Sequence, residues 1–311
     1  MKKLSKKEEK KLELSNFEQY QEYYWKTRQL YEQSFIHKMS LQTRKRLYPL
    51  LYRILKLRNK LLGNKLSMIN NTFEHTDRPK IYAITHLGKL DIEMISEALK
   101  EHYYVLSGDF ENLHGTMDGL FLEVNGIIYV NENDKEDRKK VRETMISTLK
   151  SGGNIMYFPE GTWNLTPNLP VLQLFPGIID IARESNAIIV PIAIEQYDKQ
   201  FIGNVGHNFD VETYYKEGLS REQIKDLLRD TLATLKWEIY ETVPMLDRTK
   251  SRDQYFDEMI TSRMSEWPGF TYEEVISKEY KDKNVTTPDE AFEHLKHLQP
   301  KKENAFLLRR K

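Results

Sequence analysis

The chain has 311 residues, of which 39% are hydrophobic and 30% are charged, and its 47 Lys and Arg residues balance its 47 Asp and Glu residues. This length allows one large domain or two modest domains with a well-buried core. The zero formal net charge provides no overall attraction to nucleic acid, so we expect no nucleic-acid partner. The absence of cysteine excludes disulfides, thiolate metal ligands and a cysteine nucleophile.

Residues 1–32 predict polar helix with aromatic side chains on one face. The first eleven residues carry charges of both signs and lead into no apolar run, which indicates that they are not a signal peptide. No stretch reaches the roughly eighteen uninterrupted apolar residues of a membrane-spanning helix. We therefore expect a cytoplasmic protein.

The segment between Glu32 and Glu74 has no acidic residue. Its basic residues are Lys38, Arg44, Lys45, Arg46, Arg53, Lys56, Arg58, Lys60 and Lys65. Between them, leucines and one isoleucine over 47–62 form an apolar stripe at helical spacing. Such a helix commonly packs its apolar stripe on a core. Alternatively it lies on an anionic membrane surface, where each basic residue contributes about 1 kcal/mol.

From about residue 79 the pattern alternates between strand and helix. The expected strands are 80–85, 103–107, 126–131, 154–158 and 187–195, and the expected helices are 92–102, 135–150 and 177–185. Repeated units of this kind predict an α/β fold with a mixed, mostly parallel sheet flanked by helices. A helix from Ser220 to about Leu235, a last helix at Pro288–Leu298 and a frayed tail at 301–311 are expected to follow.

We accordingly divide the chain into three regions. Residues 1–78 are the helical N-terminal region with the basic amphipathic segment, 79–245 are the α/β core, and 246–311 are a C-terminal helical extension and tail. No internal repeat and no low-complexity linker separates them.

The first candidate site block is His86-Leu-Gly-Lys-Leu-Asp91, directly after an apolar strand. The carboxyl ends of strands in open α/β sheets are where ligands bind. A neutral imidazole can remove a proton from a hydroxyl, and Asp91 could orient the ring and stabilise the imidazolium. The spacing alone is a weak signal, because a loop histidine beside an unrelated helix-start aspartate has the same pattern.

The second block is Phe158-Pro-Glu-Gly-Thr162, also at the end of a buried strand. Pro159 and Gly161 indicate an unusual turn that holds Glu160 between them. This block offers a carboxylate, backbone N–H groups and a hydroxyl, which could bind an acceptor or an oxyanion. A turn chosen for its geometry alone would look the same.

Taken together, these blocks resemble the glycerolipid acyltransferase family, which includes lysophosphatidate and glycerol-3-phosphate acyltransferases. Four blocks match in order over about residues 79–200: His86 with Asp91, Gly126-Ile-Ile-Tyr-Val130, Phe158-Pro-Glu-Gly-Thr162, and Val190-Pro-Ile192. Gly177 stands where the family usually has a glycine that opens a helix. The resemblance implies that His86 is the general base and Asp91 orients it. It further implies that Glu160, Gly161 and Thr162 shape the acceptor pocket, that Gly126 and Lys89 contribute to substrate binding, and that no metal is needed.

This sequence departs from the family at basic positions. The second block usually ends in arginine, where this chain has Asn131-Glu132, and the third continues with arginine, where this chain has Trp163. Phe175-Pro176 replace further basic residues. In the family those arginines are taken to bind the acceptor's phosphate, and each such contact contributes roughly 1.5–3 kcal/mol. We therefore expect Trp163 to adjust the pocket for a lysolipid or glycolipid acceptor, with Lys89 and Arg138 as remaining sources of positive charge.

The resemblance implies transfer of a fatty acyl group from acyl-CoA or acyl carrier protein, as co-substrate, to a hydroxyl of a lysophospholipid-, glycerol-phosphate- or glycolipid-type acceptor. No other cofactor is expected. Since the acceptor lives in lipid, the segment at about 38–65 becomes the expected contact with an anionic membrane surface, on the cytoplasmic side. Two alternatives remain: a catalytically silent lipid-binding relative, and a lipid ester hydrolase in which His86 activates water.

Overall fold

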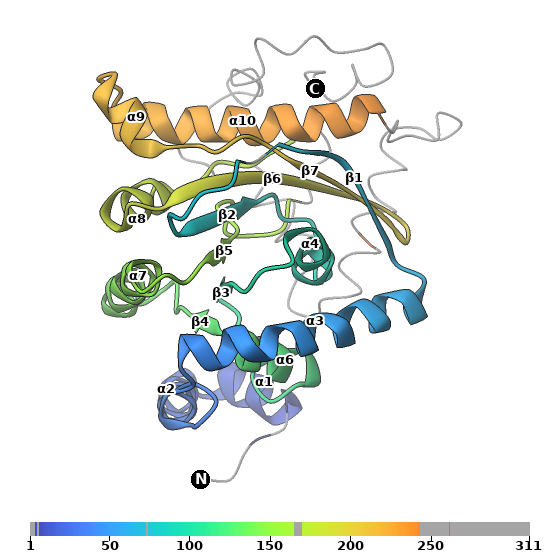
Figure 1. Cartoon of the computed structure of the whole chain (residues 1–311). Coiled ribbons are helices and arrows are strands. Elements are labelled where there is room, and N and C mark those ends of the chain that lie inside the picture. The colour runs from blue at the N-terminus through green and yellow to red at the C-terminus, as the bar shows by residue number, and fades with distance from the viewer. Residues whose placement is uncertain (1–3, 5, 73, 165–169, 243–260, 262–311) are drawn as a thin grey trace.

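The computed structural model describes residues 4, 6–72, 74–164, 170–242 and 261. Its centre is a seven-stranded sheet with the order β1-β7-β6-β2-β5-β3-β4 (Figure 1). The strands are β1 (Lys65–Asn71), β2 (Lys80–Ile84), β3 (Tyr104–Ser107), β4 (Ile127–Tyr129), β5 (Ile155–Tyr157), β6 (Ile188–Tyr197) and β7 (Gln200–Val205). Every neighbouring pair is parallel except β6 and β7. The expected mixed, mostly parallel sheet is confirmed.

Helices cover both faces of the sheet. They are α1 (Lys6–Ser15), α2 (Phe17–Gln33), α3 (Leu41–Leu62), α4 (Asp91–Leu99), α5 (Phe110–Leu113), α6 (Met117–Asn125), α7 (Lys135–Lys150), α8 (Gly177–Ser185), α9 (Val211–Lys216) and α10 (Arg221–Thr242). In Figure 1, α7 and α8 lie on one side of the sheet and α4 on the other, while α10 runs along β6 and β7. The N-terminal helices α1 to α3 gather with α6 at the β4 end of the molecule.

Two large hydrophobic clusters lie on the two faces of the sheet, and a smaller one joins β6 and β7 to α10. Ile81 and Ala83 of β2 belong to the cluster beneath α7 and α8, whereas Tyr82 and Ile84 belong to the cluster beneath α4. All five residues of β2 are buried. A parallel strand that is covered on both faces reads as a continuous apolar run, as β2 does in the sequence.

Two buried arginines attach the N-terminal helices to the core. Arg28 of α2 donates to the carbonyl of Tyr129 and forms an ion pair with Asp137 at 3.5 Å. Arg44 of α3 donates to the carbonyls of Glu123 and Val124 at 2.7 and 2.8 Å. Since charged groups are buried only when they are paired, these contacts fix the orientation of both helices.

The docking of α3 leaves part of its apolar stripe exposed. The buried residues of this helix are Arg44, Tyr48 and Asn59. On the opposite side lie Leu50, Ile54, Leu57 and Leu61, at successive spacings of four, three and four residues, and all four are exposed. Within the described residues no helix is long and apolar enough to cross a membrane.

The sequence did not predict β1, β7, α5, α6 or α9. The basic helix ends at Leu62 because Gly63 adopts a left-handed conformation, with φ of 81°. β1 then pairs with β7, so the sheet begins before residue 79, where the α/β core was expected to start. The expected helix Pro288–Leu298 and the tail 301–311 lie outside the described residues.

Candidate active site

The imidazole of His86 and the carboxylate of Asp91 form a hydrogen-bonded pair. His86 follows β2, Asp91 begins α4, and Nδ1 of the histidine lies 3.0 Å from Oδ2 of the aspartate. The same Oδ2 accepts hydrogen bonds from the N–H groups of Leu87 and Gly88 at 2.6 and 2.9 Å. Asp91 is almost fully buried, and the side chain of His86 is 17% exposed. With Nδ1 directed to Asp91, the neutral ring presents an unprotonated Nε2 as the basic atom.

Two aromatic rings contact the imidazole of His86, one on its face and one edge-on. The ring of Phe158 stacks on His86 with centroids 4.0 Å apart and planes inclined by 23°. Trp163 approaches the same imidazole edge-on at 6.0 Å. The sequence drew attention to the block that contains Phe158 but gave that residue no role, because its place over the imidazole depends on β2 and β5 being neighbours.

Glu160 holds the backbone of His86. Its Oε1 accepts a hydrogen bond from the N–H of His86 at 3.0 Å, and its Oε2 accepts from the N–H of Leu172 at 2.7 Å. The N–H of Asn164 in turn donates to the carbonyl of His86 at 2.7 Å. Burial raises the pKa of Glu160 to about 7, although the two N–H donors oppose this shift. The carboxylate of Glu160 therefore contacts the protein backbone.

Gly161 gives the turn its shape. Its φ is +69°, a conformation that side chains disfavour. A Cβ at this position would lie 2.2 Å from the ring of Phe175. The third block is thus a turn in which Glu160 points inward to the backbone, while the next residues lie at the surface of a cavity.

A cavity of about 1540 Å³ opens at the carboxyl ends of β2, β5, β3 and β4. His86, Lys89, Gly161, Thr162 and Trp163 line it, together with residues of α2, α3, α6, α7 and α8. It extends along β3 and reaches both faces of this strand, because Val105 and Leu106 both contribute to its wall. Both sequence blocks therefore lie at the carboxyl ends of their strands, where the sequence indicated a ligand site.

Three of the expected site residues do not line this cavity. Asp91 is buried, and its carboxylate binds the imidazole of His86. Glu160 is buried behind the cavity, as described above. Gly126 lies at the amino end of β4, whereas His86 lies at the carboxyl end of β2. Its φ is +125°, and a Cβ there would lie 2.7 Å from the ring of Tyr104. This placement supports a role for Gly126 in close packing, and it does not support contact with substrate.

The two remaining positive groups that the sequence offered are both engaged. Lys89 lines the cavity, and its Nζ lies 3.6 Å from Oδ2 of Asp118. Arg138 also lines the cavity, and its guanidinium donates to the carbonyl of Glu132. Lys89 is therefore paired with a carboxylate, whereas Arg138 binds a neutral carbonyl and keeps its positive charge.

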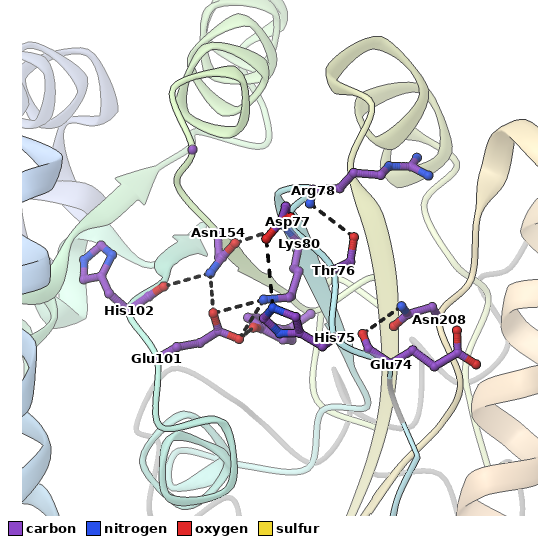
Figure 2. A network of polar contacts seen from close by, with 12 residues as sticks. Glu74, His75, Thr76, Asp77, Arg78, Lys80, Glu101, His102, Asn154 and Asn208 are labelled. Carbon is purple, nitrogen blue, oxygen red and sulfur yellow. Dashed lines mark hydrogen bonds and ion pairs between the residues drawn. The ribbon is translucent and has the colours of Figure 1, made fainter.

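A second polar network lies at the amino ends of the central strands (Figure 2). Lys80 pairs with Glu101 at 3.1 Å, and Asn154 donates to Glu101 at 3.0 Å and to the carbonyl of His102 at 3.2 Å. Burial lowers the pKa of His102 to about 4, so this ring is neutral near pH 7. The network joins the beginnings of β2, β3 and β5, which indicates a structural role. No cluster of three or more metal-ligating side chains exists among the residues that the structure describes.

Comparison with known proteins agrees with the site. Residues 65–195 match the family model described as Acyltransferase. The match includes the His86 and Glu160 blocks, and it agrees with the acyltransferase resemblance that the sequence showed. Among solved structures, the crystal structure of the 1-acyl-sn-glycerophosphate (LPA) acyltransferase PlsC from Thermotoga maritima is similar, with 15% sequence identity and a TM-score of 0.49. That similarity covers 65% of this chain and 85% of the other. No match was found among the curated proteins.

Proposed function

We propose, since residues 65–195 form a domain of the acyltransferase family, that the chain transfers a fatty acyl group from a thioester to a hydroxyl of a glycerolipid-type acceptor. The observation that carries the proposal is the His86–Asp91 pair at the wall of a large cavity. The donor is acyl-CoA or acyl carrier protein, and the acceptor is a lysophospholipid-, glycerol-phosphate- or glycolipid-type molecule. The reaction needs no further cofactor.

His86 acts as the general base in this proposal. Its Nε2 removes the proton from the acceptor hydroxyl while the oxygen attacks the thioester carbonyl. The C–S bond then breaks, the ester is formed, and the departing thiolate takes the proton back from the imidazolium. The negative charge of Asp91 stabilises the imidazolium between the two proton transfers, and the ring stays in place because Phe158 stacks on it.

The apolar branch of the cavity suits an acyl chain. Tyr103 and Val105 of the β3 segment line it, as do Leu51 and Leu55 of α3. Ser107 and Tyr103 are four residues apart, which corresponds to about 13 Å at about 3.3 Å per residue. A chain that enters beside His86 can therefore bury a run of methylene groups here, each contributing about 0.8 kcal/mol.

The exposed stripe of α3 suits a membrane surface. Leu50, Ile54, Leu57 and Leu61 face outward, and the exposed basic residues Arg46, Arg53 and Lys60 lie beside them on the helix. Leu51 and Leu55 of the same helix line the cavity. We propose that α3 lies on an anionic membrane at the cytoplasmic face, where a lipid acceptor can enter the cavity directly.

Transfer of radiolabelled palmitoyl from CoA and from acyl carrier protein tests this function. The full chain is offered lysophospholipids, glycerol-3-phosphate and glycolipids, alongside His86→Ala and the matched control His207→Ala, whose histidine is exposed. We expect a labelled lipid product with the wild type and the control, and none with His86→Ala. Vesicle binding without any product would favour a silent lipid-binding relative, and release of free fatty acid without an acceptor would favour a hydrolase.

A further inference from the structure

The wall of the active-site cavity carries more negative than positive groups. Its carboxylates are Glu13, Glu93, Asp109, Glu111, Asp118, Glu132 and Asp134. Its cationic side chains are Lys89, Arg138 and Arg142. Lys89 pairs with Asp118, Arg138 donates to a backbone carbonyl, and Arg142 pairs with Glu184. Two of the carboxylates, Glu93 and Asp118, also pair with Arg58. The carboxylates still outnumber the cations of the cavity wall, and two of the three cations pair with carboxylates.

Part of this negative charge lies where β3 and β4 end. A Cβ at Gly108 would lie 2.6 Å from Oε1 of Glu132, so the carboxylate of Glu132 lies against the loop that follows β3. Burial raises the pKa of Tyr157, at the end of β5, to about 12, and the charge of Glu132 adds to this shift. The negative charge of Glu132 therefore acts near the ends of three neighbouring strands, β5, β3 and β4.

The same part of the cavity offers polar amides and aromatic faces. Asn112, Asn131 and Asn133 line it beside the carboxylates. Carboxylates accept hydrogen bonds from hydroxyls, and amides both donate to and accept from them. Phe175 is 57% exposed, packs against Gly161 and lines the cavity together with Trp163. A cavity wall that holds both hydroxyl-binding groups and an exposed ring complements a molecule with a polar edge and an apolar face.

We propose that the acceptor carries a neutral, hydroxyl-rich headgroup, such as a sugar attached to an acylglycerol, and no phosphate monoester. This inference rests on the acyl transfer proposed above and names its acceptor. A phosphate monoester has a charge of about −1.5 to −2 near pH 7, and the carboxylates, which outnumber the cations of the wall, would repel it. A sugar avoids that repulsion and can use the carboxylates and amides as hydrogen-bonding partners.

The test compares three acceptors with the same acyl chain: a glucosyl monoacylglycerol, lysophosphatidate and lysophosphatidylcholine. The quantity measured is kcat/KM of the full chain for each. We expect the glucosyl lipid to exceed lysophosphatidate by about ten-fold or more, which corresponds to about 1.4 kcal/mol. Higher kcat/KM for lysophosphatidate would overturn the proposal. Preference for the choline lipid would overturn it too, because the carboxylates would then serve a cationic headgroup.

A charge reversal shows whether the cavity wall causes the preference. In Glu132→Arg the ratio of kcat/KM for the glucosyl lipid to kcat/KM for lysophosphatidate should fall by about ten-fold. The ratio for Glu132→Gln should lie between those of this variant and the wild type. Glu136→Arg makes the same charge change at an exposed position outside the cavity and should leave the ratio unchanged. An unchanged ratio in Glu132→Arg, or an equal change in Glu136→Arg, contradicts the inference. Failure of the proposed acyl transfer looks different, because no acceptor would then be acylated in a manner that depends on His86.

Discussion

The carboxylate of Glu160 binds the backbone N–H of His86 at 3.0 Å, and this contact joins the third sequence block to the first. The other oxygen of Glu160 binds the N–H of Leu172, in the segment that leads to Phe175. Arg229 of α10 donates to the carbonyl of Val171, next to Leu172, at 3.2 Å. A single buried carboxylate therefore connects the histidine loop to a wall of the cavity. We interpret Glu160 as a positioning residue.

The stability of the protein should depend on the ionisation of Glu160. Burial raises the pKa of this carboxyl from 4.5 to about 7, so ionisation costs more free energy in the folded chain than in the unfolded chain. The contribution of Glu160 to stability is therefore fully present below pH 4.5 and is lost as the pH rises to about 7. The loss is about 3 kcal/mol, at 1.36 kcal/mol per pKa unit.

Urea unfolding of the wild type and Glu160→Gln at pH 5 and pH 8 measures this loss. The variant has no titrating group at this position, and the other groups titrate alike in both proteins. We expect the wild type to lose stability relative to Glu160→Gln between pH 5 and pH 8. A difference between the two proteins that is the same at both pH values contradicts the prediction.

Replacing Gly161 should reduce activity through Phe175. In Gly161→Ala the left-handed conformation costs about 1–2 kcal/mol, and the new Cβ displaces the ring of Phe175. Gly152→Ala is the matched control, because Gly152 also has a positive φ but nothing lies within 4 Å of its Cβ position. Thermal unfolding should show a similar destabilisation in both variants, whereas acyl transfer should fall only in Gly161→Ala. Equal activity in the two variants would show that Phe175 is not part of the site.

Residue patterns predicted the sheet edge at which the site lies, and they predicted α7 and α8 with their observed bounds. The strand β1 was missed because its residues are mostly polar and half of them face solvent at the edge of the sheet, which gives no apolar run. The inward direction of Glu160 was also beyond reach, because a side chain in an irregular turn follows no periodicity. Its partner Leu172 lies twelve residues further along the chain, and the spacing of residues within the block does not indicate this contact.

The orientation of α3 shows a further limit of periodicity. The spacing of the leucines in α3 indicates which of them share a face, but it does not indicate which face docks. The docked face is the one with Arg44, Tyr48 and Asn59, because Arg44 donates to five backbone carbonyls of α6 and of the loop before α3. Polar contacts thus decide which face of α3 docks on the core.

Changing Asp91 should slow the chemical step. In Asp91→Asn the side chain keeps its size but loses the charge that stabilises the imidazolium, so kcat should fall by about 10²–10⁴-fold with little change in KM. Steady-state kinetics with the preferred acceptor measures both constants. Asp226→Asn, at an exposed position on α10, makes the same chemical change and should behave as the wild type. A rise in KM with kcat unchanged would contradict the role of Asp91 in the chemical step. Circular dichroism checks that both variants are folded.

Membrane binding should depend on the exposed stripe of α3. Leu57 and Leu61 are 58% and 78% exposed, and burial of a leucine side chain in lipid contributes about 1.5–3 kcal/mol. In the double variant Leu57→Glu with Leu61→Glu, binding to vesicles of phosphatidylglycerol and phosphatidylcholine should fall by at least about a hundred-fold. Higher salt should weaken the binding of the wild type, because it screens the attraction between lipid and protein charges. Sedimentation with the vesicles measures both effects.

Leu227→Glu is the control for the vesicle experiment. Leu227 is also an exposed leucine, but it lies on α10, at the other end of the molecule from α3 (Figure 1). The variant should therefore bind vesicles as the wild type does. Comparable losses in Leu227→Glu and in the α3 variant would mean that the negative charge itself reduces binding, regardless of its position. Unchanged binding in the α3 variant would place the membrane contact on another surface. If only the α3 variant loses binding, the membrane contact lies on α3. Leu51 and Leu55 of the same helix line the cavity, so lipid would then enter the cavity along α3.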